Sequence, residues 1–301
     1  MTSSAAPGVT GHAHTAPAFI DRFAPLAASY DVVLCDVWGV VHNGVAATLP
    51  ACDALARFRA GGGTVMLITN APRAAHVVRQ FCDKLHVPHD AYDGIVSSGD
   101  VTRDVIVHRR GERVFHIGPK RDVSVFSELG IEALAPAESA DYVVCTGLFD
   151  DDRERPENYR PLLTQLRSRD LLMVCANPDL VVERGERLVY CAGAIADLYG
   201  SLGGEVLFAG KPHRPIYETA LAKAAAVRGR PPTLDRVLAI GDSVRTDLTG
   251  ANCFGIDCLF VTAGIHAEEL GGRDNPDAAL LAQKFVDARA FPKAVMRRLA
   301  W

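Results

Sequence analysis

Continuous apolar runs bounded by polar residues recur in the first quarter of the chain. Residues 31–36 (DVVLCD) and 64–69 (TVMLIT) have the pattern of parallel strands that are buried on both faces. Between them, the apolar positions of residues 52–60 follow a helical period, which three glycines at 61–63 end. A strand, a helix and a second strand in this order predict a βαβ unit. A further helical pattern covers residues 20–28.

The last third of the chain repeats this alternation. Helical patterns cover residues 215–227 and 247–254, and apolar runs typical of strands cover 237–241 and 258–262. Strands that alternate with helices indicate a parallel sheet with helices on both faces. We therefore predict an α/β fold: a doubly wound, Rossmann-like parallel sheet whose two halves in the sequence are separated by an insertion.

The insertion is long enough to form a domain of its own. It lies between Asn70 and Lys211, and a crossover connection needs far fewer than the 140 residues that separate these two. Three apolar runs within it are typical of strands, at 114–118, 142–146 and 171–175. We therefore expect a second α/β unit, a cap, inserted into the core.

Length and composition agree with two domains. The chain has 301 residues, of which 49% are hydrophobic and 23% charged, as in ordinary globular proteins. We predict a core of residues 18–104 and 206–301 and an α/β cap domain of residues 105–205. Residues 1–17 are rich in small residues and lack periodicity, so we predict a disordered tail there.

The net charge and the cysteines of the chain indicate which binding partners and which cellular compartment to expect. A formal net charge of −4 lacks the positive excess of nucleic-acid binders, so no nucleic acid is expected. Eight cysteines are scattered without a CxxC pair, which favours reduced thiols. The chain begins without the pattern of a signal peptide, and no apolar stretch reaches the roughly 18 residues of a membrane span. We predict a cytoplasmic protein with no membrane partner.

Polar residues gather where the core strands end. Six of them lie at or shortly after the ends of apolar runs: Asp36, Thr69, Asn70, Lys211, Asp242 and Asp247. Ligands of doubly wound sheets bind at the carboxyl ends of the strands, so these side chains are expected to face one site. Carboxylates hold Mg²⁺, while a lysine and a hydroxyl bind phosphate oxygens. The set therefore predicts a site for Mg²⁺ and a phosphoryl group.

Four segments occur in a fixed order along the chain: LCDVWGVVHNG, LITNAPR, AGKPHRPIYETAL and AIGDSVRTDLTGA. Together they resemble the four motifs of the haloacid dehalogenase-like (HAD) phosphohydrolases. The long insertion after the second motif resembles subclass IIA, which contains nucleotide- and sugar-phosphate phosphatases with a large α/β cap. The triplet Asn177-Pro178-Asp179 also resembles one that recurs in caps of this subclass.

The resemblance implies a role for each strand-end residue. Asp36 would be the nucleophile that forms an aspartyl phosphate, and it would also ligate Mg²⁺. Thr69 and Asn70 would bind the phosphate, and Lys211 would offset negative charge in the transition state. Asp242 would ligate the metal, and so would the backbone carbonyl of residue 38. Asp247 would hold metal-bound waters or orient Lys211, with a helix cap as its alternative role.

One position departs from the family pattern. The family usually has a second aspartate two residues after the nucleophile, as general acid and base, and this chain has Trp38. An indole does not exchange a proton at neutral pH, and general acid–base assistance is typically worth about 10²- to 10⁴-fold in rate. Three alternatives follow. The leaving group departs unprotonated, another residue such as His42 supplies the proton, or the protein binds a phosphate ester with little turnover.

Specificity is expected to reside in the cap. The short distance from Asp36 to the next helix leaves no room for a cap at that point, so the insertion must cover the site. Asn177 and Asp179 are candidates for contacting the non-phosphate part of the substrate, and a simple turn is the alternative interpretation.

The leading hypothesis is a Mg²⁺-dependent phosphatase that acts on a small phosphorylated metabolite, such as a sugar phosphate, through an aspartyl phosphate. The alternative is a phosphate-ester binding or regulatory protein with weak or no turnover because of Trp38. A phosphotransferase or mutase is a third class that no residue specifically favours. Caps of the resembled subclass often support dimers, so a homodimer is an expected assembly.

Overall fold

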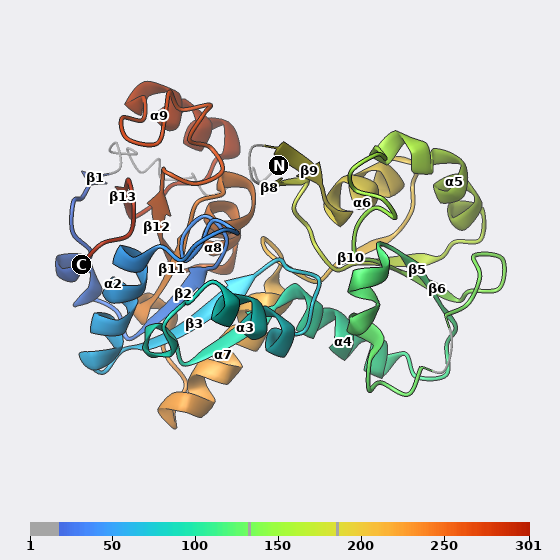
Figure 1. Cartoon of the computed structure of the whole chain (residues 1–301), viewed down its shortest axis with the longest axis horizontal. Coiled ribbons are helices and arrows are strands. Elements are labelled where there is room, and N and C mark those ends of the chain that lie inside the picture. The colour runs from blue at the N-terminus through green and yellow to red at the C-terminus, as the bar shows by residue number, and fades with distance from the viewer. Residues whose placement is uncertain (1–17, 132–133, 185–186) are drawn as a thin grey trace, which may run out of the picture.

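The computed structural model describes residues 18–131, 134–184 and 187–301. The predicted disordered tail, residues 1–17, lies outside the described residues. The described chain forms two lobes, each built around its own sheet (Figure 1). Among the described residues, no helix has both the length and the hydropathy that crossing a bilayer requires.

The larger lobe contains a sheet of seven parallel strands in the order β1-β13-β12-β11-β2-β3-β4. Its strands are β1 (Ala18–Phe19), β2 (Val32–Asp36), β3 (Thr64–Thr69), β4 (Gly94–Ser97), β11 (Val237–Gly241), β12 (Asp257–Val261) and β13 (Ala294–Met296). The chain runs outward from β2 to β4 in one direction and from β11 to β13 in the other. The strand order therefore reverses between β2 and β11, where doubly wound sheets bind their ligands.

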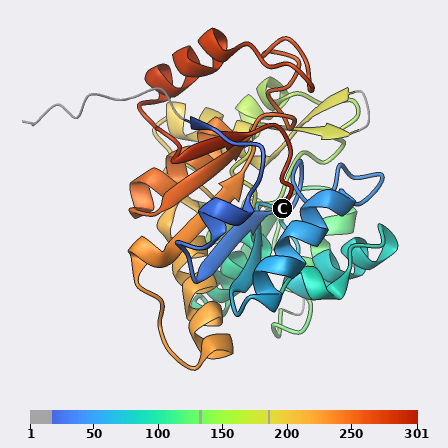
Figure 2. The same ribbon diagram turned by 90° about the vertical axis from the view of Figure 1, so that its left-hand side faces the viewer.

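Helices cover both faces of this sheet (Figure 2). The larger lobe contains α1 (Ala24–Ala27), α2 (Leu49–Ala60), α3 (Ala75–Lys84), α4 (Ser98–His108), α7 (Arg214–Arg228), α8 (Thr249–Phe254), α9 (Ala278–Ala288) and the short helices η1 (His89–Ala91), η4 (Leu234–Arg236) and η5 (Val244–Leu248). Within β2, Val33 and Cys35 pack toward α2 and α3, while Val32 and Leu34 pack toward α7 and α8. Burial on both faces explains the continuous apolar run.

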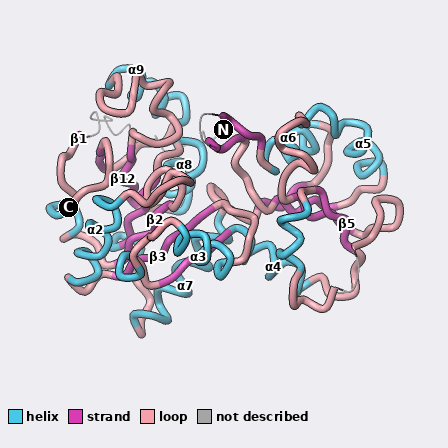
Figure 3. The backbone as a smooth tube through the Cα atoms, in the orientation of Figure 1, coloured by secondary structure: helices cyan, strands magenta, loops and turns pink. Residues whose placement is uncertain are grey.

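The smaller lobe contains a second sheet, whose strands are drawn in magenta around β5 in Figure 3. Its four parallel strands have the order β10-β7-β6-β5. These are β5 (Val114–Ile117), β6 (Tyr142–Cys145), β7 (Leu172–Cys175) and β10 (Val206–Phe208). Helices α5 (Arg160–Ser168) and α6 (Ala192–Ser201) and the short helices η2 (Lys120–Phe126) and η3 (Pro156–Tyr159) complete it, with an antiparallel hairpin of β8 (Val181–Arg184) and β9 (Arg187–Tyr190).

The α/β fold class predicted from the sequence is confirmed, and most predicted strands and helices differ from the observed ones by one to three residues at an end. The domain limits stay a prediction. The first limit falls inside α4, and β10 pairs with the cap sheet although it lies beyond residue 205. The helix expected over 20–28 is shortened to α1, because Pro25 is tolerated only in the first turn. The helix expected from residue 247 instead follows η5, a π-helical turn that begins at Val244.

Phe260→Ala is expected to lower the free energy of unfolding by about 3–5 kcal/mol, because it opens a cavity in the larger lobe. Phe260 of β12 is fully buried, and its ring meets that of Phe285 edge-on with centroids 5.3 Å apart. Denaturant titration measures the change. Val286→Ala, at an exposed position of α9, is the control and should change stability by no more than about 0.5 kcal/mol. Equal effects of the two substitutions would contradict this packing.

Candidate active site

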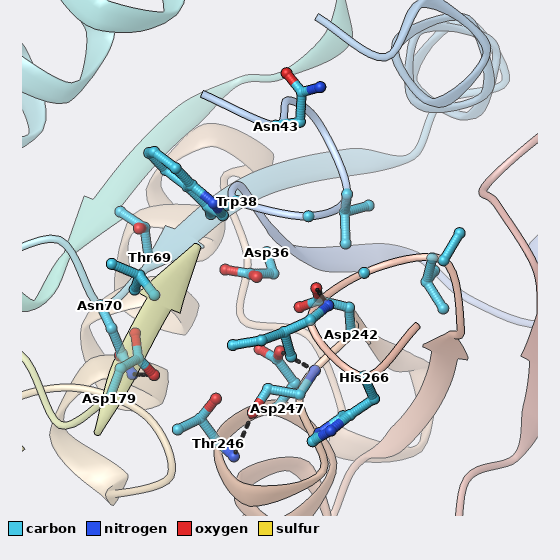
Figure 4. Close-up of a pocket in the computed structure, with 18 of the residues that line it drawn as sticks. Asp36, Trp38, Asn43, Thr69, Asn70, Asp179, Asp242, Thr246, Asp247 and His266 are labelled. Carbon is cyan, nitrogen blue, oxygen red and sulfur yellow. Dashed lines mark hydrogen bonds between the residues drawn. The ribbon is translucent and has the colours of Figure 1, made fainter. Parts of the chain in front are cut away.

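Three buried carboxylates meet at the point where the strand order of the larger sheet reverses. Asp36 is the last residue of β2, Asp242 directly follows β11, and Asp247 lies in η5. One oxygen from each lies within 4.8 Å of the others, and Figure 4 shows the three side chains converging on one cavity. Oxygen donors at this spacing fit a single hard divalent cation.

Lys211 lies among these carboxylates. Its Nζ donates to Oδ1 of Asp36 and to Oδ1 of Asp247, each at 2.6 Å, and the side chain is 3% exposed. Burial opposes the charge on Lys211, but Asp247 and Asp36 raise its pKa well above the ordinary value of a lysine. The lysine is therefore held as a fixed positive charge beside Asp36.

The cluster carries more negative than positive charge, since one lysine faces three carboxylates. Burial raises the pKa of Asp36, and the charge of Asp247 adds to that increase. Burial also raises the pKa of Asp242, with further contributions from Asp36 and Asp247. Burial and the charges of the neighbouring carboxylates therefore both disfavour the ionised forms. A cation would remove the repulsion between these charges, so the charge balance also fits a metal site.

Backbone from two loops closes tightly around Asp242. Its Oδ2 accepts the Ile265 N–H at 2.8 Å. A Cβ at Gly264 would lie 1.8 Å from the same oxygen, and one at Gly39 would lie 2.0 Å from it. Gly39 also has a φ of +84°, which favours glycine. Both positions therefore require glycine, and together they fix this carboxylate.

Asp247 is held from its own segment. Its Oδ2 accepts the Ser243 N–H at 3.1 Å, while the Ser243 hydroxyl oxygen accepts the Thr246 N–H at 3.3 Å as the N-cap of η5. The alternative that Asp247 is the helix cap is therefore wrong, because Ser243 occupies that position. Asp247 Oδ1 is directed to Lys211 instead.

Thr69 and Asn70 end β3 beside the carboxylates. The Thr69 hydroxyl accepts the Ala71 N–H at 3.2 Å. The Asn70 side chain joins three segments. Its Oδ1 accepts the Lys211 N–H at 2.7 Å, and its Nδ2 donates to the Lys211 carbonyl at 3.1 Å and to Asp179 Oδ1 at 3.0 Å. Both amide protons of Asn70 are thus engaged by the protein, which leaves the backbone N–H of this residue as the group for the predicted phosphate contact.

The two cap candidates differ in their placement. Asn177 Oδ1 accepts the Asp179 N–H at 3.1 Å, a bond that closes a turn, so the turn interpretation describes the Asn177 side chain. Asp179 instead reaches the core and meets Asn70. Figure 4 shows Asp179 beside Asn70 on one wall of the cavity, with Asp242 and Asp247 across from it.

Two cavities adjoin at Trp38, which lines both. The first, of about 590 Å³, contains the three carboxylates and Lys211. The second, of about 510 Å³, lies between the lobes. Four residues that the sequence analysis did not single out also line the first cavity: Arg245, His266, Arg273 and Arg298. Arg245 lies within the segment AIGDSVRTDLTGA, whereas His266, Arg273 and Arg298 belong to none of the four segments, so only the packing of their loops identifies these three.

Trp38 is held in place by its neighbours. Its ring stacks nearly parallel to Phe81 with centroids 6.4 Å apart, and the His42 ring meets it edge-on at 5.2 Å. A Cβ at Gly44 would lie 2.6 Å from the indole, and Gly44 has a φ of +83°. These contacts fix the indole between the two cavities.

His42 does not provide the missing acid. Burial lowers the pKa of His42 to about 4, and its Nδ1 accepts the Gly44 N–H at 3.1 Å. The imidazole is therefore neutral near pH 7, where it has no acidic proton to give. The hypothesis that His42 replaces the aspartate is thus contradicted by its burial.

A family model described as haloacid dehalogenase-like hydrolase matches residues 33–132, and a HAD-hydrolase-like model matches residues 208–288. No curated protein was found to match the chain.

Among solved structures, a hydrolase of the haloacid dehalogenase-like family from Brucella suis 1330 has 47% sequence identity and a TM-score of 0.83, over 94% of this chain and 100% of that one. A possible sugar phosphatase from Cytophaga hutchinsonii has 20% identity and a TM-score of 0.73, over 93% of this chain and 97% of that one. A p-nitrophenyl phosphatase from Archaeoglobus fulgidus has 18% identity and a TM-score of 0.69, over 90% of this chain and 97% of that one. The resemblance predicted from the four motifs is confirmed: this chain belongs to the haloacid dehalogenase-like hydrolase family.

Proposed function

We propose that this protein is a Mg²⁺-dependent phosphatase that hydrolyses a phosphoric monoester of a small metabolite through an aspartyl phosphate on Asp36. The buried cluster of Asp36, Asp242, Asp247 and Lys211 carries the proposal, because its charge and spacing suit a divalent cation and a phosphoryl group. The phosphatase names of structural relatives support the same class of reaction.

In this proposal, Asp36 Oδ attacks phosphorus and the ester oxygen leaves. Lys211 offsets negative charge on the phosphoryl oxygens, and Thr69 and the backbone of Asn70 bind those oxygens. Asp36, Asp242, Asp247 and the backbone carbonyl of Trp38 would hold Mg²⁺, which supplies charge neutralisation and polarisation of the phosphoryl group. Water then attacks the aspartyl phosphate and restores the Asp36 carboxylate.

Phosphate release tests this proposal. Purified protein is incubated with 4-nitrophenyl phosphate and a panel of sugar and cofactor phosphates, with Mg²⁺ or with excess EDTA. The aryl phosphate should be hydrolysed with Mg²⁺, because its leaving group departs without a proton. Excess EDTA should lower the rate of hydrolysis by about 10²-fold or more. Equal rates with and without metal would contradict the role of the acidic cluster.

A phosphate-ester binding protein is the second candidate, and the fixed indole of Trp38 in place of an acid favours it. Such a protein would be stabilised against heat by a phosphate ester without releasing phosphate. The same panel therefore separates the two candidates. A homodimer and a cytoplasmic location stay predictions.

A further inference from the structure

The ionisable side chains around the two cavities leave one candidate for the acid that position 38 lacks. In the second cavity, Asp122 pairs with Arg73 at 2.9 Å. Asp151 pairs with Arg184 at 2.6 Å and also with Arg121. Burial acts to raise the pKa of Asp151, but Arg184 and Arg121 hold it below its usual range. Burial raises the pKa of Asp122, and Arg73 acts against that increase. Both carboxyl groups are committed to guanidinium partners, which favour the ionised form and make them poorer proton donors than a carboxyl group without an ion pair.

The first cavity offers no histidine for this role. His266 Nε2 accepts the Val244 N–H at 3.2 Å, and its Nδ1 faces Glu269 at 3.2 Å. Both ring nitrogens are therefore engaged within the core. The carboxylates of Asp36, Asp242 and Asp247 belong to the charged cluster around Lys211.

Asp179 differs from all of these groups. Within the described part of the chain, it forms no ion pair, and its hydrogen-bonding partner is the neutral amide of Asn70. It lines both cavities, as Trp38 does, so it reaches the space where the two meet. A carboxyl group paired with an amide can exist in either protonation state, which acid–base catalysis requires.

The loop that carries Asp179 is tightly packed. Asn177 closes the turn onto the Asp179 N–H, and a Cβ at Gly193 of α6 would lie 2.3 Å from the Pro178 carbonyl oxygen. Gly193 therefore lets the loop sit directly on α6. Positioned carboxyl groups are more effective catalysts than mobile ones, because the reacting geometry is fixed in advance.

Burial favours a protonated fraction of Asp179. Burial is the largest cause and raises its pKa, and the charge of Asp247 raises it further. Lys211, the Asn70 hydrogen bond and Arg245 act in the opposite direction. The charge of Asp179 in turn contributes to the raised pKa of Asp36, so the two groups lie within electrostatic reach of each other.

We propose that Asp179, supplied by the cap, is the general acid and base that replaces the carboxyl group missing at Trp38. This role rests on the proposed phosphatase function. In the first step, an Asp36 oxygen bonds to phosphorus, the bond from phosphorus to the ester oxygen breaks, and the Asp179 carboxyl gives its proton to that oxygen. In the second step, the Asp179 carboxylate takes a proton from water, whose oxygen bonds to phosphorus and displaces the Asp36 carboxylate as phosphate leaves.

Asp179→Asn tests the role, since an asparagine oxygen can still accept the bond from Asn70 while the amide neither gives nor takes a proton. The substrates are 4-nitrophenyl phosphate, phenyl phosphate and glycerol phosphate, which place increasingly basic leaving groups on one phosphoryl centre. We expect kcat/KM to change less than about threefold for the nitrophenyl ester and to fall by about 10²- to 10⁴-fold for the glycerol ester.

The second step gives an independent signal. With 4-nitrophenyl phosphate, the Asp179→Asn variant should release one nitrophenol per site in a burst and then turn over slowly. Hydrolysis of the aspartyl phosphate is slow because the variant lacks the base that takes a proton from water. Asp179→Glu, which keeps an acid, should recover part of the activity toward glycerol phosphate. Asp170→Asn is the matched control, because Asp170 is an exposed cap carboxylate that pairs with Arg167 of the cap and lines neither cavity.

The outcomes separate the two proposals. An equal loss of kcat/KM for all three esters, or no loss for any, would overturn the role of Asp179 and leave the phosphatase proposal standing if Asp36 is still required. If the wild-type protein released no more phosphate than the Asp36→Asn variant, both the phosphatase proposal and the role of Asp179 would be overturned.

Discussion

Asp36→Asn is expected to lower kcat for 4-nitrophenyl phosphate by about 10⁴-fold or more, as loss of a covalent nucleophile does in other enzymes. An amide oxygen does not displace the ester oxygen to form a stable acyl phosphate, so the first step of the proposed mechanism is lost. The loss should be similar for every ester, because each reaction begins with the same attack. Nitrophenol absorbance with saturating Mg²⁺ measures it.

The fold should survive this substitution. Asp36 is one of three buried carboxylates that repel one another, and Lys211 keeps its bond to Asp247 when Asp36 becomes neutral. The variant in EDTA is therefore expected to unfold at a temperature no lower than the wild type. Asp53→Asn, on the exposed face of α2, is the control and should leave activity unchanged. Activity of Asp36→Asn within about tenfold of the wild type would exclude Asp36 as the nucleophile.

Lys211→Met is expected to lower both activity and stability. Its Nζ lies 2.6 Å from Asp36 and from Asp247, so its removal leaves buried carboxylates without a positive partner. Breaking a buried ion pair in this way typically costs about 3–5 kcal/mol. Loss of a fixed charge at the reacting centre typically costs about 10²- to 10³-fold in kcat. Denaturant titration in EDTA and phosphate release with Mg²⁺ measure the two effects.

Mg²⁺ should restore part of the stability of this variant, because a divalent cation takes over the neutralisation of the three carboxylates. The gain in unfolding free energy on adding Mg²⁺ should therefore be larger for Lys211→Met than for the wild type. Lys223→Met provides the comparison, since Lys223 is 43% exposed and pairs with Asp100 at 3.3 Å, where about 1 kcal/mol or less is expected. Equal destabilisation by the two substitutions would show that Lys211 lies in no low-dielectric cluster.

The sequence by itself determined most of the core strands and the residues at their ends, but not the short edge strand β1 or its neighbour β13. Buried parallel strands are apolar on both faces, so β3 and β11 are visible as uninterrupted runs with the bounds that the structure has. The carboxyl ends of such strands share one edge of the sheet, so Asp36, Thr69 and Asp242 could be expected to meet. These features depend on local pattern and on a general rule of topology. Lys211 follows β10, which pairs with the cap sheet, so the packing of the two lobes brings it to the carboxylates.

The tertiary structure decided everything that depends on how the lobes and loops pack. Asp179 accepts a hydrogen bond from Asn70, which lies 109 positions earlier in the sequence. No local sequence pattern encodes where the cap loop packs against the core. The hairpin of β8 and β9 is short and carries charged residues, so its strands lack the apolar run that marks the others.

Protonation and packing near position 38 were also beyond the sequence. His42 could be proposed as an acid from its place in the chain, but burial against Trp38 and Phe81 keeps it neutral. A pKa depends on solvation and on the charges around the group, and both are properties of the folded surroundings. The sequence therefore determined which groups could do the chemistry, and only the packing of the folded chain decided which of them stand where protons can be exchanged.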